Sequence, residues 1–204
     1  MSTRRIDPGA VRRRVVEATV ECLVEHGYAG TTTQRVQVEA GVSRGALLHH
    51  FPSKPAMFLA AVQHVGEQQE LAIRAAAERS ISGPDRLDFA FEVLHEAMSG
   101  PLYLAGYELW MAARTDSDLR SVLTPYERSV GQNLRELGVM IFGPELSALP
   151  GFPTAFESLV QMFRGLALTG VLRENPGRDK ELISAWRSVF PAMCAMAQPQ
   201  PAGR

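Results

Sequence analysis

The sequence contains little cysteine and no long apolar run. Only Cys22 and Cys194 occur among its 204 residues, which is too few for a disulfide framework. Both lie in apolar helical patterns, so we expect buried free thiols in a reducing cytoplasm. No apolar stretch approaches the roughly 20 residues of a membrane-spanning helix, and the charged start of the chain lacks the apolar segment of a secretory signal. We therefore expect a cytoplasmic protein that does not associate with membranes.

The motifs that carry most enzyme chemistry are also missing. There is no nucleophile motif, no glycine-rich phosphate-binding loop and no Cys/His spacing of a zinc site. One Glu-x-x-His, formed by Glu92 and His95, would place a carboxylate and an imidazole one helical turn apart, as in di-iron bundles. Such a site needs two copies, and the sequence has one. We therefore expect no metal, no other cofactor and no enzymatic activity.

Charge is nearly balanced over the whole chain but not along it. The formal net charge is −1, with 21 Lys and Arg against 22 Asp and Glu. Residues 1–60 carry eight basic and five acidic side chains, whereas the remaining residues carry 13 and 17. A basic N-terminal part suits a polyanion such as DNA, and the acidic remainder does not.

Apolar residues recur at helical spacing through most of the chain, and no strand-like alternation or internal repeat is present. The expected helices cover about 11–26, two short segments within 31–50, and 54–80, 85–99, 102–115, 117–141, 154–174 and 179–197. Glycine and proline mark the breaks, including a loop expected over 143–153. The prediction is an all-α fold of about nine helices with a disordered tail from residue 199.

Residues 31–51 are predicted to form two short helices joined by a tight turn. Thr32 or Thr33 can cap the first helix, because a hydroxyl there accepts a hydrogen bond from a first-turn N–H group. Gly41 stands where the chain must reverse, at a positive φ that glycine adopts without a Cβ clash. Ser43 can cap the second helix. This arrangement is typical of the helix-turn-helix whose second helix enters a DNA major groove.

The two faces of the second short helix differ in chemistry. Leu47 and Phe51 are expected to point inward, together with Val36 and Ala40 of the first helix. The outer face has no acidic side chain and consists of Arg44, Gly45, Leu48 and His49. The alternative to a DNA-reading helix is an ordinary corner between two helices of a bundle.

Several residue types at fixed spacing across three predicted helices carry a resemblance to a known family. They are Gly27-Tyr28, Thr32, Ala40-Gly41-Val42-Ser43, Gly45-Ala46-Leu47, His50-Phe51 and Ser53-Lys54. With them, residues 15–59 resemble the DNA-binding domain of the tetracycline-repressor (TetR) family, over roughly a quarter of the chain. The resemblance implies an N-terminal arm and helix-turn-helix domain over 1–53 and a ligand-binding and dimerisation domain over 54–204.

The candidate DNA-binding residues follow from this resemblance and from the outer face of the second helix. They are Thr32, Thr33, Ser43, Arg44, Gly45, Ala46, Leu48, His49, His50 and Lys54. Arg44 can donate two hydrogen bonds to guanine, and His49 can reach a base edge or a phosphate. Lys54 matches the family's phosphate-contacting lysine. The chain departs from the family where Leu48 replaces a common Tyr and Ala46 a common Thr, which places more of the phosphate contact on the adjacent histidines.

Basic residues before the helix-turn-helix allow two interpretations. Arg4 and Arg5 can lie in a minor groove or along phosphates, or they can belong to a solvated tail. Residues 12–14 are three arginines in the first turn of a helix, where the helix dipole disfavours cations. That placement favours nearby phosphates, with a solvated surface as the alternative.

The last two expected helices resemble the family's dimer interface, in which two helices of each subunit form a four-helix arrangement. The candidate interface residues are Phe156, Leu159, Val160, Phe163, Ala167, Val171, Trp186, Val189, Phe190 and Met193. A two-fold dimer would place two recognition helices about 34 Å apart, in successive major grooves. The alternative is that these side chains belong to the core of one subunit.

Polar and aromatic side chains on otherwise apolar helices mark a candidate effector pocket, because small-molecule sites combine an apolar lining with a few polar groups. The candidates are His95, Tyr103, Tyr107, Trp110, Met111, Arg114, Tyr126, Gln161 and Arg164. The family's effectors bind in this region, and the alternative for each residue is a surface or ion-paired position. We expect a partly apolar small molecule.

Together these features predict a homodimeric TetR-type transcriptional regulator. The favoured prediction is a repressor that binds a (pseudo)palindromic DNA operator. A small molecule that binds the DNA-incompetent arrangement more tightly would release it. The coupling is expected to run through the helix at 54–80, where it meets the DNA-binding domain. The alternatives are an α-helical enzyme or metal carrier, and a regulator with a filled core that a partner protein controls.

Overall fold

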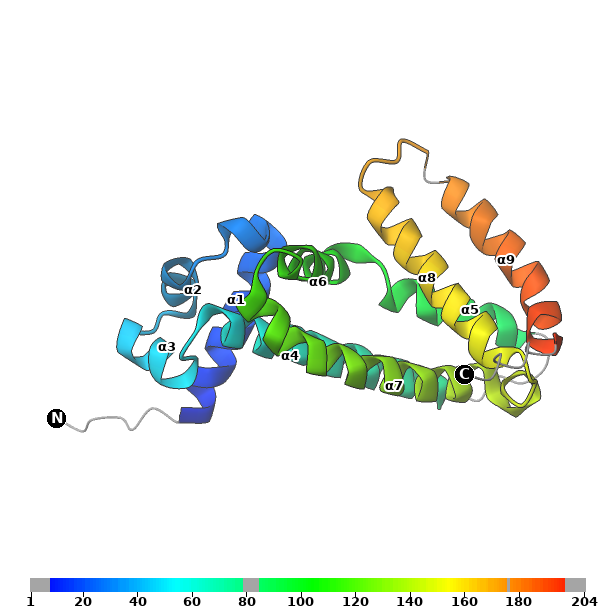
Figure 1. The fold of residues 1–204 in the computed structure, drawn as a ribbon, viewed down its shortest axis with the longest axis horizontal. Helices are drawn as coiled ribbons and strands as arrows, with labels where there is room; N and C mark the ends of the chain where they lie inside the picture. Colours follow the sequence, from blue (N-terminus) through cyan, green and yellow to red (C-terminus); the bar gives the residue numbers. More distant parts are fainter. Residues whose placement is uncertain (1–7, 79–84, 176, 197–204) are drawn as a thin grey trace, which may run out of the picture. The chain divides into compact units, whose positions relative to one another are not determined.

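The structure is a computed structural model, and it describes residues 8–78, 85–175 and 177–196. Across these ranges it contains nine α-helices and no strand (Figure 1). The helices are α1 (Pro8–Gly30), α2 (Thr33–Ala40), α3 (Arg44–His50), α4 (Lys54–Ala77), α5 (Asp85–Ala97), α6 (Gly100–Ala113), α7 (Ser117–Ser147), α8 (Phe152–Gly170) and α9 (Gly177–Ala195). The predicted all-α fold of about nine helices is confirmed. Within the same ranges, no helix has the length and apolarity needed to cross a bilayer.

Two glycines with positive φ interrupt helices. Gly27 (φ 64°) ends the regular part of α1, as the sequence predicts, and one further turn runs to residue 30. Gly143 (φ 77°) interrupts α7 without ending it, so only four residues separate α7 from α8. The expected loop over 143–153 is therefore wrong, because a single glycine redirects the helix. Arg86 supports this bend by donating a hydrogen bond to the Ile141 carbonyl oxygen (3.0 Å).

The chain divides into two compact units. Unit 1 consists of Met1–Gln68 and Pro101–Val130, and unit 2 of Gln69–Gly100 and Gly131–Arg204. Unit 1 thus combines α1, α2, α3 and the first part of α4 with α6 and the first part of α7. Helices α4 and α7 continue into unit 2, which also holds α5, α8 and α9. A functional boundary after residue 53 stays a prediction. Three expectations lie outside the described residues: the roles of Arg4 and Arg5, the break expected between the helices at 54–80 and 85–99, and the tail from residue 199.

One apolar core joins the helices of unit 1. Its buried side chains include Val15, Val16, Val36, Ala40, Leu47, Phe51, Phe58, Leu109, Leu119 and Leu123. They come from α1, α2, α3, α4, α6 and α7, so the two short helices pack on the same core as α6 and α7. Burial of this apolar surface is the main force that holds the helix-turn-helix in place.

Unit 2 is built around phenylalanine rings. The buried rings belong to Phe91, Phe142, Phe152, Phe156, Phe163 and Phe190. Neighbouring rings lie 4.8–6.3 Å apart between centres, in stacked or edge-to-face pairs. Such pairs contribute about 0.5–1.5 kcal/mol each beyond burial of their area. Because they come from α5, α7, α8 and α9, they hold these four helices to one another.

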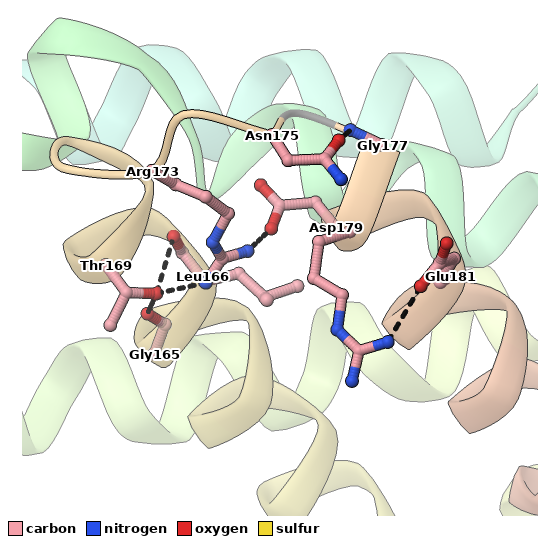
Figure 2. Close-up of polar contacts among 9 residues, drawn as sticks. Gly165, Leu166, Thr169, Arg173, Asn175, Gly177, Asp179 and Glu181 are labelled. Carbon is pink, nitrogen blue, oxygen red and sulfur yellow. Dashed lines mark hydrogen bonds and ion pairs between the residues drawn. The ribbon is translucent and has the colours of Figure 1, made fainter.

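Polar contacts hold the connection between α8 and α9 (Figure 2). Arg173 lies just after α8 and forms an ion pair with Asp179 in the first turn of α9. The Asn175 side-chain oxygen accepts a hydrogen bond from the Gly177 N–H group (2.9 Å) at the start of α9. An acidic side chain in a first turn is favoured by the helix dipole. Asp179 therefore stabilises both the helix start and the connection.

Candidate nucleic-acid interface

The helix-turn-helix forms as the sequence predicts. The Thr32 hydroxyl oxygen accepts a hydrogen bond from the Arg35 N–H group (3.1 Å) and caps α2. This helix ends at Gly41, whose backbone is left-handed (φ 59°, ψ 42°). The Ser43 hydroxyl oxygen accepts a hydrogen bond from the Ala46 N–H group (3.2 Å) and caps α3. Both caps and the positive φ of the turn are confirmed.

The outer face of α3 is open to solvent. Leu47 and Phe51 are buried against the core of unit 1, with 2% and 3% of their surface exposed. The exposed positions are Arg44, Gly45, Leu48 and His49, as predicted. A Cβ atom added to Gly45 would have no heavy atom within 4 Å. Packing inside the protein therefore does not require glycine at this position, whereas close approach of another molecule to the α3 backbone would require it.

The remaining candidates on α2 and α3 lie at the edge of this face. Thr33 is the first residue of α2 and is half-buried, as are Ala46 and His50. The rings of His49 and His50 meet edge to face, with centres 5.2 Å apart. Two imidazoles at the C-terminal end of α3 add donors there. Contacts of these residues with DNA stay predictions.

Arg14 of α1 holds the turn between α2 and α3. Its guanidinium group donates hydrogen bonds to the carbonyl oxygens of Ala40 and Gly41, the latter at 3.0 Å. These carbonyl groups lie at the C-terminal end of α2, where the helix dipole favours a cation. Arg12 is also engaged, because its guanidinium group lies over the Phe51 ring at 5.6 Å. Sequence reasoning placed both arginines near phosphates and missed these contacts, since no local spacing predicts them.

Lys54, the candidate phosphate contact at the start of α4, lies against aromatic rings. Its ammonium nitrogen is 4.7 Å from the centre of the Tyr28 ring and 5.1 Å from that of Phe58. Burial lowers the pKa of this amine from its ordinary value. A cation over a ring face is stabilised by the ring quadrupole. The lysine is thus held in place within unit 1, and its contact with a phosphate stays a prediction.

Tyr28 joins the end of α1 to α6 and α7. Its backbone N–H group donates to Glu108 Oε2 (2.7 Å), and its hydroxyl group donates to Asp116 Oδ2 (2.8 Å). Asp116 Oδ1 also accepts a hydrogen bond from the Leu119 N–H group (2.9 Å) in the first turn of α7. The bonds from Leu119 and Tyr28 hold the pKa of Asp116 below its ordinary value. We refer to Tyr28, Glu108 and Asp116 as the Tyr28 link; sequence reasoning missed it.

Comparison with known proteins agrees with this geometry. Residues 15–61 match the family model described as bacterial regulatory proteins, tetR family. The HTH-type transcriptional regulator CymR of Pseudomonas putida is 31% identical over 168 residues, which span 81% of this chain and 81% of CymR. The chain belongs to the TetR family. It is therefore a transcriptional regulator with a DNA-binding helix-turn-helix.

Two further similarities concern a transcriptional repressor and a multidrug binding protein. The HTH-type transcriptional repressor AcnR of Corynebacterium efficiens is 30% identical over 132 residues, 61% of this chain and 62% of AcnR. The multidrug binding protein EbrR, solved with imidazole, superimposes with a TM-score of 0.64 and 23% identity. That alignment covers 99% of this chain and 96% of EbrR, and it shows a common fold.

Three of the candidate effector residues of α6, namely Tyr103, Tyr107 and Trp110, form a row of aromatic rings in this TetR-family protein. The rings of Tyr103 and Tyr107 meet edge to face at 5.3 Å, and those of Tyr107 and Trp110 at 5.0 Å. All three are half-buried, whereas Met111 is 59% exposed and Arg114 is exposed. The structure therefore brings the three rings together and leaves Met111 directed to solvent.

Tyr126 joins α7 to α4 within unit 1. Its hydroxyl group donates to the Val62 carbonyl oxygen at 3.0 Å. A Cβ atom added to Gly66 would lie 2.2 Å from this hydroxyl oxygen, so a larger residue at position 66 would displace the Tyr126 hydroxyl group from its place against α4. A structural role for Tyr126 is thus visible, and ligand contact stays a prediction.

The remaining effector candidates belong to unit 2. His95 is half-buried, and its ring lies 5.6 Å from that of Phe163. Burial lowers the pKa of this imidazole below its ordinary value. Arg164 is half-buried and Gln161 is exposed. Glu92, the partner of His95 in the single Glu-x-x-His, is exposed, and no cluster of potential metal ligands occurs among the described residues.

Half of the candidate dimer residues are buried within unit 2. Phe156, Leu159, Val160, Phe163 and Phe190 are buried. Ala167, Trp186 and Met193 are half-buried, and Val171 and Val189 are exposed. Helical spacing marks the apolar stripe correctly, but half of that stripe is buried within the chain, and its buried rings, those of Phe156, Phe163 and Phe190, pack on other phenylalanine rings of unit 2. An interface between two copies would therefore depend on the exposed apolar positions, which also include Leu168 and Leu172.

Proposed function

We propose that this TetR-family protein is a cytoplasmic repressor that binds a (pseudo)palindromic operator as a homodimer and is released by a small molecule. The single observation that most supports DNA binding is the exposed outer face of α3, which is positioned by two helix caps and the left-handed Gly41. Arg44 begins this face, and its guanidinium group can pair with guanine through two hydrogen bonds. The name of the relative AcnR as a repressor supports repression over activation.

A two-fold dimer would present two copies of α3 about 34 Å apart, one turn of DNA. Exposed apolar side chains on and near α8 and α9 support this part of the proposal. They are Leu168, Val171, Leu172, Val189 and Met196. A second copy that covers them would remove this surface from water. Sedimentation of the wild type should give the mass of two chains, and Leu168→Glu with Val189→Glu should give that of one, because the interface would bury unpaired charges.

Release requires a ligand with different affinities for two arrangements of the protein. EbrR, which shares the fold, is described as a multidrug binding protein and was solved with imidazole and with ethidium. That similarity supports a small-molecule effector for this chain. Helix α4 is our proposed lever, because it starts beside the helix-turn-helix at Lys54 and continues into unit 2. The Tyr28 link offers a second connection, since it ties α1 to α6 and α7.

The direct test is footprinting on DNA upstream of this gene, with and without candidate ligands. Affinity should fall steeply with salt, because Lys and Arg release counterions from phosphates. Arg44→Ala should weaken binding to the footprinted site by about 1–3 kcal/mol, and binding to unrelated DNA much less. Arg44→Lys is the matched control, since it keeps the charge but loses the paired geometry. Equal losses on all sequences would make Arg44 a phosphate contact, and salt-independent binding would contradict the proposed function.

A further inference from the structure

A groove of about 460 Å³ lies between α6 and α7 within unit 1. Trp110 and Arg114 line it from α6 and its end, and Arg120, Glu127 and Arg128 line it from α7. We call it the α6–α7 groove. Its volume falls within the roughly 300–1,000 Å³ typical of small-molecule sites. Sequence reasoning pointed to Trp110 and Arg114, and to Tyr126 on α7, but missed Arg120, Glu127 and Arg128.

The lining combines an apolar floor with a basic rim. The floor includes Leu123, which is only 3% exposed. The indole N–H group of Trp110 donates to Glu127 Oε1, and this bond joins the α6 wall of the groove to the α7 wall. The rim carries three exposed arginines, at 114, 120 and 128, against one carboxylate. Within the described residues, none of their guanidinium groups has a hydrogen-bond or ion-pair partner.

We infer that the α6–α7 groove binds a small organic anion with an aromatic or aliphatic body. The guanidinium groups would hold a carboxylate, sulfonate or phosphate, because arginine presents paired donors that match these groups. The body would pack on the half-buried Trp110 ring above Leu123, which removes apolar surface of the ring and of the ligand from water. An uncharged molecule of the same shape would gain only the second contribution, so the groove selects for negative charge.

Such a ligand would lie beside the Tyr28 link. The two walls of the groove meet at the turn between α6 and α7, which contains Asp116. Asp116 accepts the hydrogen bond from the Tyr28 hydroxyl group and the one from the Leu119 N–H group. A body inserted between Trp110 and α7 would change the spacing of the two helices at this turn. This step rests on the proposed function, because it makes the organic anion an effector of DNA binding.

The test uses a matched pair of probes on the full chain. 8-Anilinonaphthalene-1-sulfonate (ANS) is an amphipathic anion, and N-phenyl-1-naphthylamine has the same body without the sulfonate. In a Trp186→Phe background, Trp110 is the remaining tryptophan, so energy transfer from indole to ANS reports binding beside it. We expect saturable transfer to ANS, with affinity about tenfold or more above that of the neutral probe.

Charge removal at the rim provides the decisive comparison. The combined variant Arg114→Gln, Arg120→Gln and Arg128→Gln should raise the ANS dissociation constant about tenfold or more and leave that of the neutral probe within about twofold. Arg135→Gln is the matched control, because Arg135 is an exposed arginine of α7 outside the groove. If the combined variant does not fold by circular dichroism, the three single variants should each weaken ANS binding about threefold. Equal ANS affinity in these variants and the control, or equal affinity for both probes, would overturn the inference.

Measurements with and without DNA separate this inference from the proposed function. ANS binding to the groove without any DNA binding would refute the proposed function, whereas the inference that the groove binds an organic anion would stand. DNA binding without ANS binding would refute only the inference that the groove binds an organic anion. Saturating ANS should change operator affinity at least about fivefold, and the combined variant should abolish this effect. If the combined variant instead makes the salt slope of DNA binding shallower by about 3, the arginines contact phosphates and the groove is not an effector site.

Discussion

Arg14 offers the sharpest test of how the helix-turn-helix is held. Arg14→Ala removes the hydrogen bonds to the Ala40 and Gly41 carbonyl oxygens at the end of α2. Hydrogen bonds from a charged donor contribute roughly 1.5–3 kcal/mol, and a cation at a helix C-terminus adds about 0.3–1 kcal/mol. Ordering an exposed arginine costs about 2 kcal/mol of side-chain entropy when it is fully restricted. Because Arg14 is exposed, each of its two bonds is taken at the lower end of this range, and we expect a net loss of about 1–2 kcal/mol in the free energy of unfolding.

Thermal unfolding measures this loss directly. For a chain of this size, each kcal/mol lowers the midpoint by about 2–4 °C, so Arg14→Ala should melt roughly 2–8 °C below the wild type. Arg13→Ala is the matched control, because Arg13 is exposed in the same turn of α1. Surface substitutions of that kind change stability by about 0.5 kcal/mol or less.

Salt dependence of DNA binding separates a structural role for Arg14 from a phosphate contact. A lost phosphate contact would make the log–log salt slope shallower by about 1. We expect Arg14→Ala to weaken operator binding while the slope stays unchanged, because the orientation of α3 is disturbed and no phosphate contact is removed. A variant that melts like the wild type and shows the shallower slope would refute the reasoning.

Three further predictions concern α3, the thiols and pH. Gly45→Ala should raise the midpoint of thermal unfolding, because alanine is favoured over glycine in a helix by about 1 kcal/mol and the added Cβ meets open space. The same variant should weaken operator binding if DNA approaches the backbone at this position. Unchanged operator affinity would contradict such a close approach. Cys22 and Cys194 are buried, and burial raises the pKa of both thiols, that of Cys194 to about 11, so a thiol reagent at pH 8 should react with both only after denaturation. Because burial lowers the pKa of His95, the unfolded chain takes up a proton near pH 6.5 that the folded chain does not. The contribution of neutral His95 to the free energy of unfolding should therefore be fully present above that pH and be lost as the pH falls. His95→Gln should reduce this loss of stability at low pH.

Much of the helix-turn-helix could be predicted because its determinants are close in sequence. Thr32 and Ser43 each cap a helix through the N–H group three residues later. Gly41 marks the reversal because only a residue without Cβ takes φ 59° at little cost. The alternation of buried Leu47 and exposed Leu48 follows from helical spacing alone. Each of these features depends on a window of a few residues.

The candidate effector and dimer residues were less predictable, because spacing shows which stripe of a helix is apolar but not what covers it. On α8, Phe156 and Phe163 meet rings of the same unit, whereas Val171 remains exposed. On α6, Trp110 lies beside a glutamate of α7 that is 17 residues away. No local pattern distinguishes a side chain covered by its own chain from one that a ligand or a second copy would cover.

By itself, the sequence determined the approximate positions of the helices, although not the end of α7, and it determined that the second short helix has an exposed outer face. Those properties come from hydrogen bonds and side-chain spacing within one or two helical turns. Only the tertiary structure decided that Arg14 bonds the turn 26 and 27 residues later and that Tyr28 reaches Glu108 across 80 residues. Partners at such separations are set by how the helices pack on a common core, because apolar burial is non-directional and selects a partner only through the whole fold.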